Sequence, residues 1–217
     1  MAVPVVQSYS GTSTSTGTVA VTAPANIADN DLLVFVASTD FSGAGTVVYT
    51  PPTGLTALFP YTNANTGTAA SVSYQAWYKI ASSEPGTYTL TLDAARLTGW
   101  AVTRIDGQNT TTPINGTAGT AVVSGEPVNP AFTTSVDNCL ILHSVTWDES
   151  KGFTSAPSGD TGVGSVDVSG HDQWHYRNSQ VTAGAHAAGT WNISAATKYV
   201  AVTIAIAEAT GVVVVRT

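Results

Sequence analysis

The densest group of side chains that could do chemistry lies in one short segment, GHDQWHYRNS, at residues 170–179. Aromatic rings beside amide, carboxylate and guanidinium groups suit sugar recognition, because a flat apolar face supplies contact area while polar groups direct hydrogen bonds. The same residue types are enriched at protein interfaces. A third interpretation places the aromatic side chains in the core and the polar ones outside, by analogy with QAWYK at residues 75–79. The candidate ligand or partner surface comprises Trp147, Asp148, Trp174, His175, Tyr176 and Arg177.

The four histidines, at positions 143, 171, 175 and 186, are not spaced for a metal site. His171 and His175 are four residues apart, which on a strand separates them by roughly 13 Å, too far to share a zinc ion. His143 lies in an apolar run and is expected to be a hydrogen-bonded, partly buried residue. We therefore predict no metal ligands.

The carboxylates do not form an acid–base pair either. Most Asp and Glu residues stand at turns, where Asp is favoured for its hydrogen bonds to the backbone. Asp148 and Glu149 are adjacent, and adjacent residues on a strand point to opposite faces. The sequence therefore predicts a protein that is not an enzyme, with no catalytic residues and no cofactor; a glycan lyase or hydrolase is the least favoured class.

The overall composition limits the partners. Lys and Arg number 7 against 14 Asp and Glu and do not cluster, which argues against nucleic acid. The longest apolar runs, at 32–37 and 200–207, are too short to cross a membrane. Cys139 is the only cysteine, so no internal disulfide can form, and its apolar neighbours predict an inert core thiol. The first residues do not resemble a signal peptide, which favours maturation in the cytoplasm.

Strand patterns run through the whole chain. Thr, Val, Tyr and Trp favour strands, and clusters of Gly, Pro, Asn and Asp punctuate them. Within residues 71–79, alternation predicts that Val72, Tyr74, Ala76 and Tyr78 share one face. The fold is expected to be all-β and antiparallel.

One strand pattern occurs twice, which indicates an internal duplication. GTVAVT at 17–22 and GTAVVS at 119–124 each precede a Pro-Ala pair, a turn containing Asp and Asn, and an apolar run. The half-repeats span about 11–107 and 113–210, followed by a C-terminal extension at 211–217. We expect residues 1–217 to form a single jelly-roll-like β-sandwich with this pseudo-duplication. The alternative is two tandem small β-sandwiches.

Several of these segments resemble a known group of β-sandwich proteins, found in bacteriophage virions and in bacterial extracellular proteins. The resemblance rests on ADNDLLVFVAS, SSEPGTYTLTLDAA, WAVTRIDGQNTTTPIN, FTTSVDNCLIL and VAVTIAIAEA, and spans roughly residues 10–210. One departure is that the turns commonly written Gly-Asp or Asp-Gly read Asn-Asp and Asp-Asn here. Both can adopt the left-handed geometry that such turns need. The motifs are structural and carry no catalytic residue.

The resemblance implies a structural protein of a bacteriophage virion: a capsid decoration or cement protein, or one associated with head or tail fibres. It would fold in the host cytoplasm, leave by lysis, form a homo-oligomer and contact major capsid or tail subunits. The alternative is a carbohydrate- or receptor-binding module that takes up a glycan. The apolar residues Val212, Val213, Val214 and Val215 form a tail expected to dock on a neighbouring subunit.

Overall fold

The computed structural model describes residues 3–42, 46–58, 62–64, 70–149, 151–168, 171–180 and 182–209. Within these ranges every regular element is a β-strand and every strand pair is antiparallel, so the all-β prediction is confirmed. No helix in the described part is long and apolar enough to cross a membrane.

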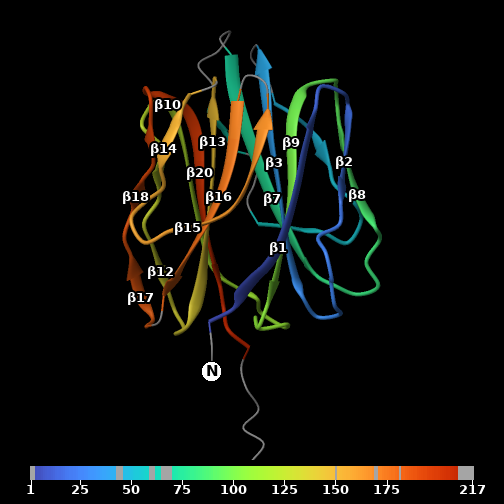
Figure 1. Ribbon diagram of the computed structural model, residues 1–217, viewed down its shortest axis with the longest axis vertical. Helices are drawn as coiled ribbons and strands as arrows, with labels where there is room; N and C mark the ends of the chain where they lie inside the picture. The colour runs from blue at the N-terminus through green and yellow to red at the C-terminus, as the bar shows by residue number, and fades with distance from the viewer. Residues whose placement is uncertain are drawn as a thin grey trace, which may run out of the picture.

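The first half of the chain supplies one large sheet and one small sheet (Figure 1). The large sheet has the order β1-β9-β3-β7-β5, and β6 also pairs with β7. Its strands are β1 (Val5–Thr14), β9 (Leu97–Asp106), β3 (Leu32–Ser42), β7 (Ala70–Ile80), β5 (Thr56–Ala57) and β6 (Thr62–Ala64). The small sheet has the order β2-β8-β4, with strands β2 (Thr18–Thr22), β8 (Thr87–Leu92) and β4 (Tyr49–Thr50).

The second half supplies the other large sheet, in the order β10-β20-β13-β16-β15. Its strands are β10 (Ile114–Gly125), β20 (Thr197–Ile206), β13 (Cys139–Asp148), β16 (His171–Gln180) and β15 (Thr161–Val168). Three short strand pairs accompany this sheet: β11 (Val128–Asn129) with β18 (Gly189–Thr190), β12 (Phe132–Thr134) with β17 (Gly184–His186), and β14 (Phe153–Ser155) with β19 (Asn192–Ile193).

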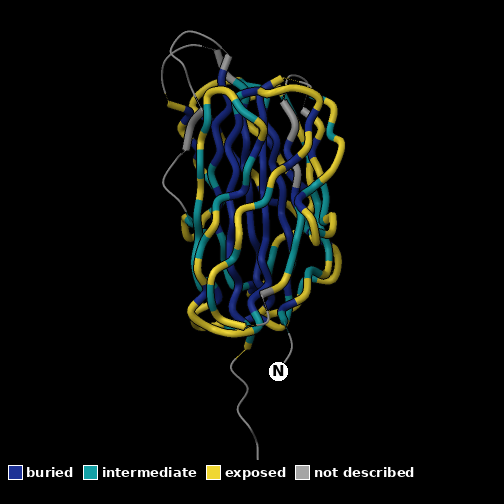
Figure 2. The backbone as a smooth tube through the Cα atoms, turned by 90° about the vertical axis from the view of Figure 1, so that its left-hand side faces the viewer, coloured by how far each residue is buried: buried dark blue, intermediate teal, exposed yellow. Residues whose placement is uncertain are grey.

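The two large sheets pack against each other through a core shared by both halves of the chain. Leu32, Val34 and Ile105 from the first sheet meet Leu140 and Ile206 from the second, all at most 2% exposed. The buried strands run through the middle of the molecule and the exposed segments lie outside them (Figure 2). Because this burial removes apolar surface of both halves from water, it holds the halves together.

The outer face of each large sheet is covered by the shorter strands of its own half. In the first half, Phe35, Trp77 and Trp100 pack against the residues of β2 and β8. In the second half, Trp147 packs in a cluster with Trp191 of the segment between β18 and β19. The molecule therefore has four layers, with the two large sheets inside.

Asparagines in the left-handed region form the turns that lead into the central strands. Asn30, two residues before β3, has a φ of 74°, and Asn138, immediately before β13, has a φ of 53°. Asn adopts this conformation at lower cost than most other residues. The expectation that Asn can replace Gly in these turns is confirmed.

The edges of the two large sheets lie beside each other. Strand β1 of the first sheet lies against β15 of the second, and Ser13 Oγ donates a 2.9 Å hydrogen bond to the carbonyl of Asp167. Tyr9 lies directly over Gly164, where a β-carbon would overlap its ring. At the opposite edges, β10 lies beside β6.

Three distant points of the chain meet at one end of the molecule. Ala209 N donates a 2.8 Å hydrogen bond to the carbonyl of Gly107, the residue that follows β9. A β-carbon on Gly107, whose φ is 77°, would lie 3.6 Å from Pro4 Cα. The start of the first half, its end and the end of the second half are therefore neighbours (Figure 1).

Candidate functional site

A cavity that contains buried ionisable groups lies on the outer face of the second large sheet. Its volume is about 480 Å³. His143 of β13 and Asn178 of β16 line it from the sheet, and Asp160, which precedes β15, lines it from a loop. The segment that carries β17 and β18 forms the remaining wall, with residues 185–190.

A buried carboxylate holds the imidazole of His143 in one orientation. Asp160 Oδ2 lies 2.6 Å from His143 Nδ1, and the side chains are 1% and 2% exposed. Asp160 Oδ1 accepts a 3.0 Å hydrogen bond from Asn178 Nδ2. Because an ionised carboxylate can only accept, Nδ1 of His143 carries the proton. The second ring nitrogen, Nε2, is buried and has no hydrogen-bond partner among the described residues.

A second histidine lies beside this pair. The ring centroid of His186 is 5.4 Å from that of His143 and 5.3 Å from that of Phe132. Burial, and then the neighbouring His143, lower the pKa of His186. His186 is therefore neutral at neutral pH and presents one lone pair and one N–H group.

This arrangement orients an imidazole but keeps it almost completely buried. General bases are often histidines oriented by a carboxylate through Nδ1, but their second nitrogen must reach the substrate, whereas Nε2 of His143 is buried. Among the described residues no group of three or more His, Cys, Asp or Glu side chains is placed to hold a metal ion.

The aromatic and polar residues predicted as a ligand surface do not form one. Trp147 is completely buried, stacks on Phe153 and therefore cannot present its face to a sugar. His175 is also completely buried, but on the other face of the sheet, where Gln173 Nε2 donates a 2.8 Å hydrogen bond to its Nε2. Burial lowers the pKa of His175 to about 3. The prediction that Gln173 and His175 face outward is wrong.

The remaining members of that set are dispersed. Asp148 is 4% exposed and lies 3.8 Å from Lys198 Nζ. Tyr176 is half-buried and packs edge-on against Trp191, and Arg177 lines a different, smaller hollow near the N-terminus. Trp174 belongs to β16, but its side chain lies outside the described residues. The tail residues Val212, Val213, Val214 and Val215 also lie outside them.

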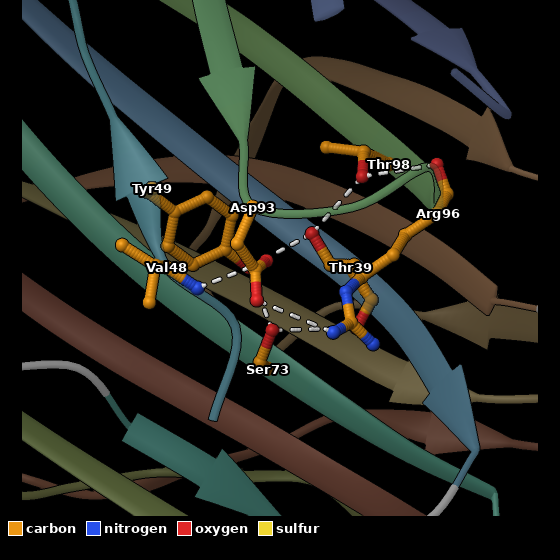
Figure 3. Close-up of polar contacts among 7 residues, drawn as sticks. All are labelled: Thr39, Val48, Tyr49, Ser73, Asp93, Arg96 and Thr98. Atoms are coloured by element: carbon orange, nitrogen blue, oxygen red, sulfur yellow. Dashed lines mark hydrogen bonds and ion pairs between the residues drawn. The ribbon is translucent and has the colours of Figure 1, made fainter. Parts of the chain in front are cut away.

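A second polar cluster lies at the other outer face, over the first large sheet (Figure 3). Tyr49 Oη lies within hydrogen-bond distance of Thr39 Oγ1, at 2.8 Å, and of Ser73 Oγ, at 2.6 Å. Thr39 Oγ1 lies 3.1 Å from Thr98 Oγ1. These hydroxyl groups bond to one another across β3, β7 and β9, so the cluster ties the large sheet to β4 and is structural.

Sequence reasoning placed one residue of the cavity correctly and missed its partners. His143 was expected to be hydrogen-bonded and partly buried, and it is bonded and almost fully buried. Asp160 was interpreted as a turn residue, and His186 carried no signal. Their distances from His143 along the chain follow no motif, so only the fold brings these three together. Cys139 is buried, as predicted for a core thiol, and burial raises its pKa to about 11.

Comparisons with known proteins add no assignment. No protein family matches the chain, and neither a curated protein nor a solved structure matches it.

Proposed function

We propose that this chain is a non-enzymatic structural protein of a bacteriophage virion, either a decoration or cement protein of the capsid exterior or a protein associated with head or tail fibres. The observation that carries the proposal is the connectivity of each half. Jelly rolls recur in viral capsid proteins and in lectins, and the strand order of each half supports a jelly-roll-like arrangement.

In a jelly roll of eight strands, one sheet contains the first, eighth, third and sixth strands and the opposing sheet contains the second, seventh, fourth and fifth. We count β5 and β6 together as the fifth strand. The large sheet of the first half then has the order β1-β9-β3-β7, and the small sheet has the order β2-β8-β4. The one difference is that β5 and β6 pair with β7 in the large sheet instead of joining the small one.

The second half follows the same scheme. Its large sheet begins β10-β20-β13-β16, and β11 and β12 pair with strands near the end of the half, as a second strand pairs with a seventh. We infer an internal duplication in which each half is one jelly roll and the two pack through their large sheets. This arrangement favours the alternative of two tandem sandwiches, joined by a shared core, over one sandwich built from both halves.

The surface supports a role based on contact with other proteins. The four large apolar side chains that are exposed in the described ranges, Val5, Val48, Val123 and Val136, lie on separate elements or loops. A surface rich in Ser, Thr and Gly and with few charged side chains suits many weak contacts with capsid or tail subunits, or with further copies of the chain. A glycan partner on the surface around Trp147 and His175 is not proposed, because both side chains are buried.

Mass spectrometry of purified particles tests the proposal, using the phage whose genome encodes this chain. We expect the chain in particles at a constant ratio to the major capsid or tail protein, and we expect purified chain to rebind particles that lack it. Absence from washed particles, together with failure to rebind, would contradict a virion role.

A further inference from the structure

We propose that a hollow at the edge between the two large sheets binds a small organic carboxylate, whose anionic group is held by the guanidinium of Arg177. The hollow has a volume of about 270 Å³ and lies where the start of β1 approaches β15 and β16. Among the described residues, its lining shares only Asn178 with the cavity around His143. Binding at this site would not depend on a virion role.

Arg177 lacks the acidic partner that the other described cations have. Five Lys and Arg side chains each lie 2.5–3.8 Å from a carboxylate oxygen, namely Lys79, Arg96, Arg104, Lys151 and Lys198. Arg177 forms no such ion pair with the described part of the chain, although Asp and Glu outnumber Lys and Arg by 14 to 7. A partly buried charge without a counter-ion carries a desolvation cost, which an anion from outside the chain would offset.

The guanidinium is accessible to a ligand in the hollow. Arg177 is partly exposed and lines the hollow. Its nitrogen atoms have no hydrogen-bond partner among the described residues, and none of them is hidden from solvent. A guanidinium stays protonated wherever proteins are folded, and its planar fork can donate two parallel hydrogen bonds to one carboxylate. The group therefore offers a fixed positive charge with the geometry that a carboxylate fits.

Two hydroxyl groups stand beside the guanidinium. Thr161 is directly opposite Arg177 in the register of β15 with β16, and Ser179 is two residues further along β16, on the same face. Both residues are exposed and line the hollow. Neither hydroxyl has a hydrogen-bond partner within the described ranges, so both can donate to an anion that Arg177 holds.

The charge of the hollow selects a monoanion. Arg177 is the only charged side chain among the described residues that line it. A single guanidinium balances one carboxylate, whereas a phosphate group near neutral pH carries about −1.5 to −2 and would stay partly uncompensated. An amino acid would bring an ammonium group, for which the described lining provides no carboxylate. The best match is therefore a carboxylate without an amine.

The remaining wall of the hollow is apolar and limits the size of the ligand. Val3, Pro4, Val5 and Leu140 supply this surface, on which a short hydrocarbon chain or a single ring can pack. Sites for drug-sized molecules have volumes of roughly 300–1,000 Å³, so this hollow suits a smaller ligand. A carboxylate that carries a few carbon atoms meets both conditions.

The corresponding position in the first half holds a tyrosine. Thr56 pairs with Tyr78 as Thr161 pairs with Arg177, so Tyr78 and Arg177 occupy the same register. Tyr78 is partly buried and packs against the core between the large sheets. The fold therefore does not require a cation at this position, which favours a binding role for Arg177.

Backbone amide chemical shifts of the full chain test the inference, with butyrate, isobutyrate and benzoate as probes. Each is titrated to about 20 mM, since ligands of this size bind with a Kd on the order of 1 mM. We expect saturable shifts at Thr161, Arg177 and Ser179, and none with the neutral analogues butyramide, isobutyramide and benzamide. Arg177→Gln should weaken binding by about ten-fold or more, because a charge-assisted pair is lost. Arg96→Gln removes the same charge from the first half and should bind normally.

A matched pair of variants at Ser179 keeps the test decisive if Arg177→Gln does not fold. Ser179→Asp, at an exposed position of the lining, supplies the missing carboxylate from the chain and should abolish binding, whereas Ser179→Asn should retain it. No shift at the hollow, equal binding of acids and amides, or binding that Arg177→Gln and Ser179→Asp leave unchanged overturns the inference. Tighter binding of inorganic phosphate than of every carboxylate overturns the choice of ligand. None of these results bears on the presence of the chain in virions.

Discussion

Ser38 Oγ donates a 2.7 Å hydrogen bond to Gln173 Oε1 across the interface between the two large sheets, and both side chains are completely buried. Gln173 then donates to His175 Nε2, so one hydroxyl of the first half begins a polar chain that ends deep in the second. These contacts fix the register of the two halves in an interface that is otherwise largely apolar.

Replacing Ser38 with Ala should therefore destabilise the protein. The change leaves Gln173 Oε1 buried without a donor, which costs about 1–3 kcal/mol in the free energy of unfolding. Urea denaturation measures the loss, and Ser124→Ala, at an exposed position, is the control. An unchanged midpoint in Ser38→Ala would mean that the bond contributes nothing to holding the halves together.

Gly164 should not tolerate a side chain. A β-carbon there would overlap the ring of Tyr9, whose centroid lies 5.4 Å from that of His175. Gly164→Ala should lower stability by about 1–3 kcal/mol, as overpacking does in other cores. Gly86→Ala is the matched control, because nothing lies within 4 Å of a β-carbon at that position. Equal thermal stability of the two variants would contradict the close packing of β1 on β15.

Asp40 should make stability fall as pH rises. Burial, and then the negative charge of Asp148, raise the pKa of Asp40 from 3.8 to about 6, although Lys198 opposes this. The folded state therefore holds a proton that the unfolded state releases. Stability contributed by the protonated form is present below about pH 4 and is lost between about pH 4 and pH 6.

Asp40→Asn should remove this part of the pH dependence and stabilise the protein at pH 7 by about 1 kcal/mol, a value that allows for solvent screening of a partly exposed group. Glu126→Gln, at an exposed position, should leave the profile unchanged. Unfolding midpoints measured from pH 4 to pH 7 decide the matter, and a variant profile parallel to that of the parent would exclude Asp40 as the source.

Tryptophan fluorescence should report a buried population. Trp100, Trp147 and Trp191 are completely buried and Trp77 is 3% exposed, so these four rings should resist acrylamide. Trp174→Phe leaves only these four, and its emission should be blue-shifted and quenched far less than that of the urea-unfolded chain. Strong quenching in the folded variant would contradict this burial and would mean that a tryptophan such as Trp147 lies on the surface.

The sequence pattern predicted strands and faces where alternation was regular. Val72, Tyr74, Ala76 and Tyr78 share the inner face as expected, because the period of two is uninterrupted there. The prediction of faces failed in β16, where the sequence QWHYR was aligned with QAWYK letter by letter. When β3 and β13 are aligned at Leu32 and Leu140, the strand pairing makes Tyr176 the counterpart of Trp77. The letter-by-letter match had instead paired Trp77 with His175, one residue earlier. A slip of one residue exchanges the two faces of a strand.

The cavity residues were beyond such reasoning for a different reason. His143 and Asn178 lie on neighbouring strands, but Asp160 and His186 approach them from loops and a short outer strand. Their placement depends on how the short strands cover the large sheet, which no periodic pattern encodes.

Pro4, Gly107 and Ala209 lie close together at one end of the molecule. The order of the two halves along the chain could therefore be exchanged without changing how the halves pack. A circular permutant that opens the chain after Gly107 and joins Ala209 to Pro4 through a short glycine linker would keep both large sheets and their shared core. The same geometry would let cargo or an affinity tag be attached at this pole while the loops of the opposite pole stay unobstructed.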